Sequence, residues 1–177
     1  VARGFEPFAT SRPGSELRVG ALLLRERWAA VLGVESTATS FVSASHLSGF
    51  AELDAASFCG DTAGWLAEVG AEDVWVVNTR AVPMLEVSVE HGATQILVAG
   101  RVAAVRLSAS EAANFDAALH AGTWPFGDAS ADHALDLDGV WLNAVWDIVR
   151  HLLPLLQRDI PLLAARGEAS RLEPSHA

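Results

Sequence analysis

Two arginines and three hydroxyl side chains lie close together in residues 10–20 (Thr-Ser-Arg-Pro-Gly-Ser-Glu-Leu-Arg-Val-Gly). Arg12 and Arg18 each carry a guanidinium, which can bind two oxygens of a phosphate at once. Gly14 and Ser15 follow Pro in a turn whose backbone N–H groups could also point at an anion. The segment therefore predicts a phosphate-binding loop, with a plain surface turn as the alternative.

The element after this loop should help to position an anion. Apolar residues recur at helical spacing over residues 16–32, and Gly33 is typical of the residue that follows a helix. We expect the loop to run directly into this helix. The exposed N–H groups and the positive dipole end of its first turn would then attract phosphate.

A second group of polar residues follows a predicted buried strand at residues 73–78. The strand is almost continuously apolar, as expected of a strand covered on both faces in a parallel sheet. Ligands of such sheets gather at the carboxyl ends of the strands. Asn78 and Arg80 should therefore emerge where a substrate lies.

The remaining patterns predict an α/β domain over residues 1–166, with a mainly parallel, Rossmann-like sheet flanked by helices, and a polar tail over residues 167–177. Ser108 and Glu111 have the spacing of a capping box and should open a helix that ends at Gly122. The other expected strands cover residues 39–44, 94–98, 102–107, 134–137 and 140–143. The other expected helices cover residues 45–53, 62–69 and 146–156, with Pro154 kinking or dividing the last, and a short final helix capped by Asp159 runs to residue 166.

Composition narrows the function classes. The chain has 177 residues, of which 51% are hydrophobic, and this suits one globular domain. A net charge of -10 argues against nucleic-acid binding, which needs a basic surface. The single Cys59 cannot form an internal disulfide, so we expect a reducing, cytoplasmic setting. No apolar run reaches the roughly 18 residues of a membrane span.

Three segments, in this order, resemble a sugar nucleotidyltransferase family related to the uridyltransferase half of bacterial bifunctional N-acetylglucosamine-1-phosphate uridyltransferases. Residues 7–20 (Pro-Phe-Ala-Thr-Ser-Arg-Pro-Gly-Ser-Glu-Leu-Arg-Val-Gly), followed by Leu-Arg-Glu-Arg-Trp at 24–28, resemble the opening of that family. Residues 76–83 (Val-Val-Asn-Thr-Arg-Ala-Val-Pro) lie where the family has a strand ending in Asn-Gly-Arg and a Pro. Residues 145–149 (Val-Trp-Asp-Ile-Val) resemble its Pro-Trp-Asp-Leu segment.

The resemblance implies an enzyme that joins a nucleoside triphosphate to a sugar 1-phosphate with Mg²⁺ and releases pyrophosphate. UTP and an N-acetylhexosamine phosphate are the favoured substrates. Arg12 stands where relatives hold a phosphate-binding Lys; the alternative is a surface Arg stacked on Phe8. Arg18 would contact the same phosphate or pair with Glu16. Gly14 and Ser15 would shape the loop, and Asn78 and Arg80 would contact sugar or nucleotide.

Departures from the family pattern leave the activity open. In well-characterised nucleotidyltransferases the comparable strand ends in Gly-Asp, and that Asp holds the metal, whereas this chain has Thr79-Arg80. Either the metal is held elsewhere, the Arg substitutes for its charge, or the domain binds without catalysing. The metal ligands therefore stay unknown, and for Asp147, the other carboxylate in a resembling segment, a structural role at a helix start is favoured.

The chain starts at Val1, and the family's first strand normally precedes this point, so we expect that strand to be missing. The competing hypothesis is a non-catalytic nucleotide-sugar binding or assembly domain that positions a left-handed β-helix acyltransferase. Whether the chain forms a homo-oligomer stays open.

Overall fold

A four-stranded sheet forms the largest β element of the computed structural model, which describes residues 5, 8–52, 54–89, 92–121 and 133–167. Its strands, in spatial order, are β5 (Asp73–Val77), β8 (Arg101–Ser108), β7 (Gln95–Val98) and β9 (Ala134–Leu137). Strands β5 and β7 both run antiparallel to β8, and β9 runs parallel to β7. A strand is present at Asp73–Val77 as predicted, but it is a half-buried edge strand paired antiparallel with β8, not a strand covered on both faces of a parallel sheet. The hairpin before and after Gly100 is confirmed.

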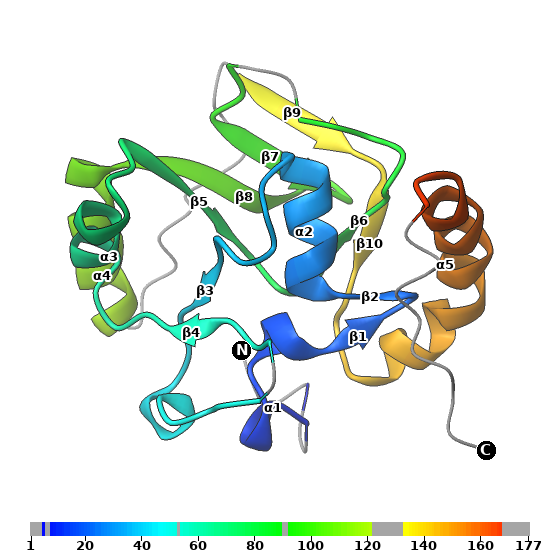
Figure 1. Cartoon of the computed structure of the whole chain (residues 1–177), viewed down its shortest axis with the longest axis horizontal. Helices are drawn as coiled ribbons and strands as arrows, with labels where there is room; N and C mark the ends of the chain where they lie inside the picture. The colour runs from blue at the N-terminus through cyan, green and yellow to red at the C-terminus, as the bar shows by residue number, and fades with distance from the viewer. Residues whose placement is uncertain (1–4, 6–7, 53, 90–91, 122–132, 168–177) are drawn as a thin grey trace.

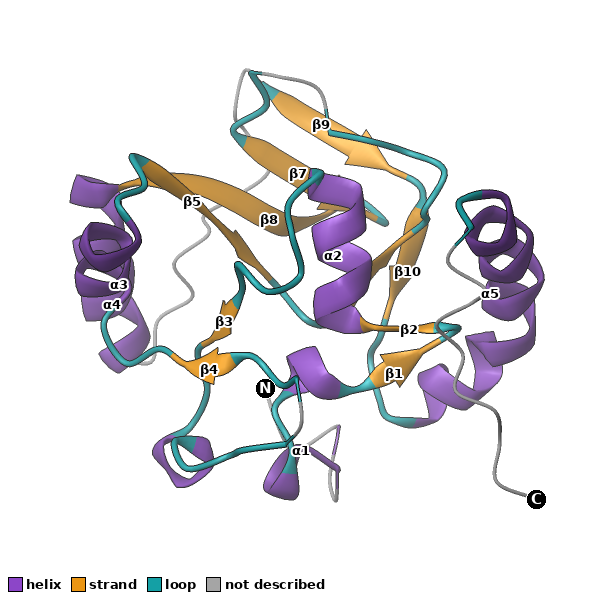
Figure 2. Ribbon diagram, viewed as in Figure 1, coloured by secondary structure: helices purple, strands orange, loops and turns teal. Residues whose placement is uncertain are grey.

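Helices lie on three sides of the domain (Figures 1 and 2). They are α2 (Leu24–Leu32), α3 (Thr62–Val69), α4 (Ala109–His120) and α5 (Trp146–Ala165). In the view of Figure 1, α2 crosses in front of the sheet, α3 and α4 lie together at the left, and α5 lies at the right. Trp28 and Val31 of α2 pack against Ile96 and Val98 of β7, all almost fully buried. The domain is therefore mixed α/β, as predicted.

Shorter elements complete the chain. The described two-stranded ribbons are β1 (Arg18–Val19) with β2 (Leu22–Leu23), β3 (Ser40–Phe41) with β4 (Ser57–Phe58), and β6 (Ala81–Pro83) with β10 (Gly139–Trp141). The first and third ribbons are antiparallel and the second is parallel. The short helical turns are α1 (Phe8–Ser11) and the 3-10 helices η2 (Gly14–Glu16) and η3 (Ser45–Leu47).

Local signals at the helix ends explain several correct boundaries. Asp61 caps α3 by accepting a hydrogen bond from the Gly64 N–H at 2.9 Å, and Gly70 ends the helix in the left-handed conformation. At α4, the Glu111 carboxylate accepts the Ser108 N–H at 2.8 Å, as the predicted capping box requires. The predicted end of α4 at residue 122 lies outside the described residues.

Several expectations are wrong, including the helix expected at residues 45–53, of which the structure has only the 3-10 turn Ser45–Leu47. Residues 16–32 do not form one helix, because Gly20 takes a positive φ of 68° and turns β1 back into β2 before α2 starts. The sheet is not mainly parallel across the described strand pairs, because tight turns such as the one at Gly100 can join only antiparallel neighbours. The helix at residues 146–165 is not divided, because α5 continues through Pro154 and Pro161.

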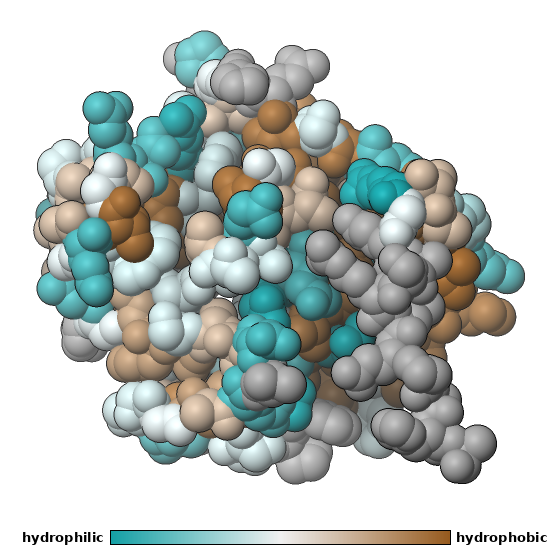
Figure 3. Space-filling model, in the orientation of Figure 1, coloured by the Kyte–Doolittle hydropathy of each residue, from teal (hydrophilic) through white to brown (hydrophobic). Residues whose placement is uncertain are grey.

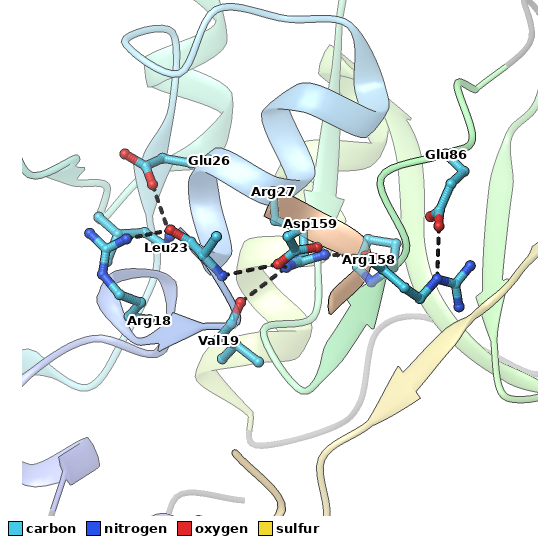
Figure 4. Close-up of polar contacts among 10 residues, drawn as sticks. Arg18, Val19, Leu23, Glu26, Arg27, Glu86, Arg158 and Asp159 are labelled. Atoms are coloured by element: carbon cyan, nitrogen blue, oxygen red, sulfur yellow. Dashed lines mark hydrogen bonds and ion pairs between the residues drawn. The ribbon is translucent and has the colours of Figure 1, made fainter. Parts of the chain in front are cut away.

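A buried ion pair joins α5 to α2 (Figure 4). Asp159, which was expected to cap a separate helix, forms an ion pair with Arg27 of α2, and both side chains are at most 1% exposed. Arg27 also donates to the carbonyl oxygens of Val19 and Pro83, each at 3.1 Å. This network fixes the last two turns of α5 against α2.

The outer face of α5 is apolar. Trp146, Val149, Leu153 and Ile160 are all more than half exposed, and Figure 3 shows brown side chains at the right-hand edge, where this helix lies. Even so, α5 and the other helices in the described ranges lack the combination of length and apolar composition needed to cross a membrane.

Candidate functional site

The two segments that the sequence singled out meet in the fold. A Cβ placed on Gly14 of η2 would lie only 2.4 Å from Oγ1 of Thr79, in the turn between β5 and β6. Because this distance is far below a van der Waals contact, any other residue at this position would force the Thr79 side chain to rotate or shift. The predicted phosphate loop and the predicted substrate end of β5 are therefore neighbours.

The end of β5 is shaped by Asn78. Its backbone N–H donates to the Ala103 carbonyl at 2.7 Å and extends the pairing with β8 by one residue. Its side-chain oxygen accepts the backbone N–H of Arg80 at 3.0 Å, which is the hydrogen bond of an Asx turn. Asn78 therefore positions Arg80 through its side chain.

Arg80 reaches away from β5 toward the end of β10. Its Nε donates to the Leu142 carbonyl at 2.7 Å, and Nη2 donates to the Asn143 carbonyl at 3.3 Å. The guanidinium carbon lies 5.8 Å from the ring centre of Phe5 and 6.0 Å from that of Trp141, within the range of cation–π attraction. Since these partners are neutral, none of them offsets the positive charge of the Arg80 guanidinium.

Arg12, by contrast, has a carboxylate partner. Its Nη2 lies 2.5 Å from Oε1 of Glu52, and its Nη1 donates to the Glu16 carbonyl at 3.3 Å. The aromatic ring beside its guanidinium is that of Phe50, at 5.9 Å. An incoming phosphate would have to compete with Glu52 for this guanidinium.

Arg18 bonds within its own hairpin. Its Nη1 donates to the Ala21 carbonyl at 2.5 Å, in the turn between β1 and β2 (Figure 4). The expected local pair with Glu16 is wrong, because the buried Glu16 carboxylate lies 2.9 Å from Nε of Arg25 instead. Arg18 is exposed, and the described contacts place its side chain on the turn at Ala21.

Ser15 is buried rather than presented on the loop surface. The residue is 8% exposed, and its Oγ has no hydrogen-bond partner in the described part of the chain. The hydroxyl thus lies inside the fold, next to the Gly14 backbone that packs on Thr79. Its contribution in this conformation is to the packing of the loop.

The strand end does not fit Mg²⁺. This ion prefers carboxylate and phosphate oxygens, and residues 78–80 supply no carboxylate. The Asn78 side-chain oxygen already accepts the Arg80 N–H. Among the residues the structure describes, no group of three His, Cys, Asp or Glu side chains could hold a metal ion.

Asp147 holds the turn that leads into α5. Its buried carboxylate accepts the backbone N–H groups of Ala144, at 3.0 Å, and Asn143, at 2.7 Å. The hydrogen bonds from Ala144 and then Asn143 lower the pKa of the Asp147 carboxyl, because they favour its charged form. Asp147 therefore fixes the position of Asn143.

Sequence reasoning missed two polar residues beside Arg80. Nη1 of Arg101 donates to the side-chain oxygen of Asn143 at 3.2 Å, and the Arg101 guanidinium carbon lies 5.3 Å from the ring centre of Trp141. Arg101 follows a Gly turn and Asn143 follows a strand, but residues 42 positions apart give no local signal of contact.

The α/β domain thus brings the Gly14 loop against Thr79 at the end of β5. A family model described as sugar nucleotidyl transferase matches residues 1–168. The chain therefore belongs to the sugar nucleotidyl transferase family, whose general role is nucleotidyl transfer with nucleotide and sugar phosphate substrates. No curated protein and no solved structure matches the chain.

Proposed function

We propose that the domain forms a nucleotide sugar from a nucleoside triphosphate and a sugar 1-phosphate, with UTP and an N-acetylhexosamine 1-phosphate as the preferred pair. A phosphate oxygen of the sugar attacks the α-phosphorus of the nucleotide, and the bond from this phosphorus to the β-phosphate oxygen breaks. Pyrophosphate leaves. The contact between Gly14 and Thr79 carries the proposal, because it joins the Arg12 loop to the end of β5 in a member of this family.

The reaction brings two anions together, so cationic side chains must offset the crowded phosphate charge. Arg12 is the proposed contact on the loop side. Its ion pair with Glu52 is partly exposed, with 38% and 45% of the two side chains accessible, and such pairs contribute at most about 1 kcal/mol. A phosphate can therefore displace the Glu52 carboxylate.

The other sequence-predicted residues take supporting roles in this proposal. Gly14 and Ser15 set the shape of the loop, and Arg18 offers a second guanidinium at the nearby hairpin. Asn78 orients Arg80 at the end of β5. Mg²⁺ is a variable of the assay, because the donor atoms of residues 78–80 do not suit it.

A second candidate function is supported by one observation. Thr79 and Arg80 stand at the strand end where a metal-binding carboxylate would be expected from the resembling enzymes. This difference favours a non-catalytic domain that binds a nucleotide sugar or helps to assemble a partner acyltransferase.

The test is a pyrophosphate-release assay on the full-length protein with UTP and N-acetylhexosamine 1-phosphates, and with other nucleotides and sugar phosphates, each with and without Mg²⁺. We expect release that is selective for one pair. Arg12→Gln should lower kcat/KM by about 10²-fold, the effect of removing one donor that stabilises transition-state charge.

The matched control is Arg106→Gln, which removes another exposed arginine that pairs with Asp73 at 2.6 Å. It should retain the wild-type rate. If the wild-type protein releases no pyrophosphate with any pair, the catalytic proposal fails and the assembly role is favoured.

A further inference from the structure

The described arginines divide by whether a carboxylate neutralises them. Those that form an ion pair are Arg12, Arg25, Arg27, Arg106, Arg150 and Arg158. Four described arginines, Arg18, Arg80, Arg101 and Arg166, have no carboxylate partner within the described residues, although the chain as a whole carries a net charge of -10. Arg18 and Arg166 donate to backbone carbonyls in separate parts of the fold, whereas Arg80 and Arg101 share a partner residue.

These two guanidiniums converge on one residue. Arg80 donates to the backbone carbonyl of Asn143 at 3.3 Å, and Arg101 donates to the side-chain oxygen of the same residue at 3.2 Å. Both guanidinium carbons also lie within about 6 Å of the Trp141 ring centre, a distance typical of cation–π contacts. Asn143 and Trp141 thus contact both guanidiniums.

The turn that holds them is itself fixed. Asp147 accepts the Asn143 N–H at 2.7 Å, and Arg80 is anchored a second time by the Leu142 carbonyl at 2.7 Å. The Trp141 Nε1 is buried and has no acceptor in the described chain, so the indole is positioned by its ring contacts. A fixed pair of arginines needs little rearrangement to receive a ligand.

The N–H groups of Arg80 and Arg101 that donate to no described acceptor indicate which class of ligand the pair could bind. A guanidinium has five N–H groups. The described hydrogen bonds use two N–H groups of Arg80 and one of Arg101. An anion with several oxygens can accept from the remaining groups and offset the repulsion between the two charges.

We propose that Arg80 and Arg101, held by Asn143 against Trp141, form a binding site for phosphoryl oxyanions, and that pyrophosphate is the ligand that fits two guanidiniums best. The proposal deepens the proposed function and rests on it for the source of pyrophosphate, which is the leaving group of that reaction. The site is separate from Arg12, whose guanidinium binds Glu52.

The test is calorimetric titration of the full-length protein with inorganic pyrophosphate, inorganic phosphate and a UDP-sugar, at low ionic strength. Arg101→Gln is compared with Arg106→Gln, which removes a second exposed arginine from the same strand β8. We expect Arg101→Gln to weaken pyrophosphate binding at least about tenfold, since a hydrogen bond to a charged group is lost. Arg106→Gln should bind pyrophosphate as the wild type does.

Comparing the three ligands shows whether the site binds phosphate, pyrophosphate or the diphosphate of a nucleotide sugar. Pyrophosphate binding that exceeds phosphate binding by tenfold or more supports a diphosphate site. A UDP-sugar that competes with pyrophosphate in wild type but not in Arg101→Gln would place the nucleotide diphosphate there instead and would overturn the leaving-group assignment.

The outcomes also distinguish this inference from the proposed function. If pyrophosphate binding is lost in Arg12→Gln and retained in Arg101→Gln, or if wild type binds none, the inference is wrong while the catalytic proposal is still decided by its own assay. If Arg101→Gln loses pyrophosphate binding but the wild type forms no nucleotide sugar, the anion site stands and the catalytic proposal fails. A circular-dichroism melt of each variant checks that it is folded.

Discussion

The surroundings of Arg27 and those of Arg80 show two uses of the same side chain. Arg27 is fully buried, pairs with Asp159 and donates to two backbone carbonyls. Arg80 is only partly buried, and its described hydrogen-bond partners are carbonyl oxygens of residues 142 and 143. The first arginine is neutralised and holds helices together, whereas the second keeps a net charge.

The difference between Arg27 and Arg80 follows from the free-energy cost of burying a charged guanidinium. A guanidinium taken out of water needs an opposite charge and hydrogen-bond acceptors to offset its desolvation. Arg27 has these at its Nη atoms, although its Nε has no partner among the described residues. At the surface, carbonyl dipoles and aromatic rings suffice to orient the group, because water still screens its charge. An arginine without a carboxylate is therefore a better candidate for ligand binding than one with a carboxylate.

The largest loss of stability should come from removing one partner of the buried Arg27–Asp159 ion pair. Arg27→Met leaves the Asp159 carboxylate buried and uncompensated, so we expect the free energy of unfolding, measured with urea, to fall by about 3–5 kcal/mol. The control is Arg27→Met combined with Asp159→Leu, which removes both charges and should recover most of the loss. An equally unstable double variant would show that the two charges do not account for the effect.

A second test addresses the turn beneath this pair. Gly20 and Gly33 have almost the same φ, 68° and 69°, but a Cβ on Gly20 would lie 2.3 Å from Oδ2 of Asp159, whereas a Cβ on Gly33 meets nothing within 4 Å. Gly33→Ala should cost about 1–2 kcal/mol for the left-handed conformation alone. Gly20→Ala should cost about 1–3 kcal/mol more, because the methyl group displaces the carboxylate.

The comparison of these two glycine variants by thermal melting isolates the contact from the backbone strain. Equal losses in Gly20→Ala and Gly33→Ala would mean that Asp159 moves aside without cost. The buried pair would then be less constrained than its geometry implies.

Local sequence signals predicted most helices and strands, but they did not predict every boundary between one element and the next. Asp61 and Gly70 bracket α3, and the residues on either side of Gly100 form the expected hairpin, because capping and turn chemistry act within a few residues. The same kind of signal at residues 16–32 was misleading. Apolar residues at helical spacing there are shared between a hairpin and a helix, and only the packing of Gly20 against α5 decides where the hairpin turns.

The two segments of the candidate site could be predicted from the sequence, but the contact between them could not. The loop at Gly14 and the turn at Thr79 were each suggested by residue type, and their contact across 65 positions was not, because nothing local records it. Arg101 and Asn143 carried no motif at all. They matter only because β8 and β10 bring them together over Trp141.

The smallest expected effect concerns the turn that carries Asn143. The pKa of Asp147 is lowered in the fold, chiefly by the Ala144 and then the Asn143 N–H, so the unfolded chain binds its proton more readily. The stability from this carboxylate is therefore present above the ordinary carboxyl pKa of 3.8 and is lost as the pH falls through the lowered folded value.

Asp147→Asn keeps an acceptor but removes the charge, and near pH 6 it should cost about 1 kcal/mol. The difference from wild type should shrink on acidification when urea unfolding is measured from pH 6 down through the acid range. Arg150→Gln removes the exposed partner at 3.2 Å and should leave this pH dependence in place. If instead Asp147→Asn lies below wild type by a constant amount at every pH, its charge does not hold the Asn143 turn, and the arginine pair rests on other contacts.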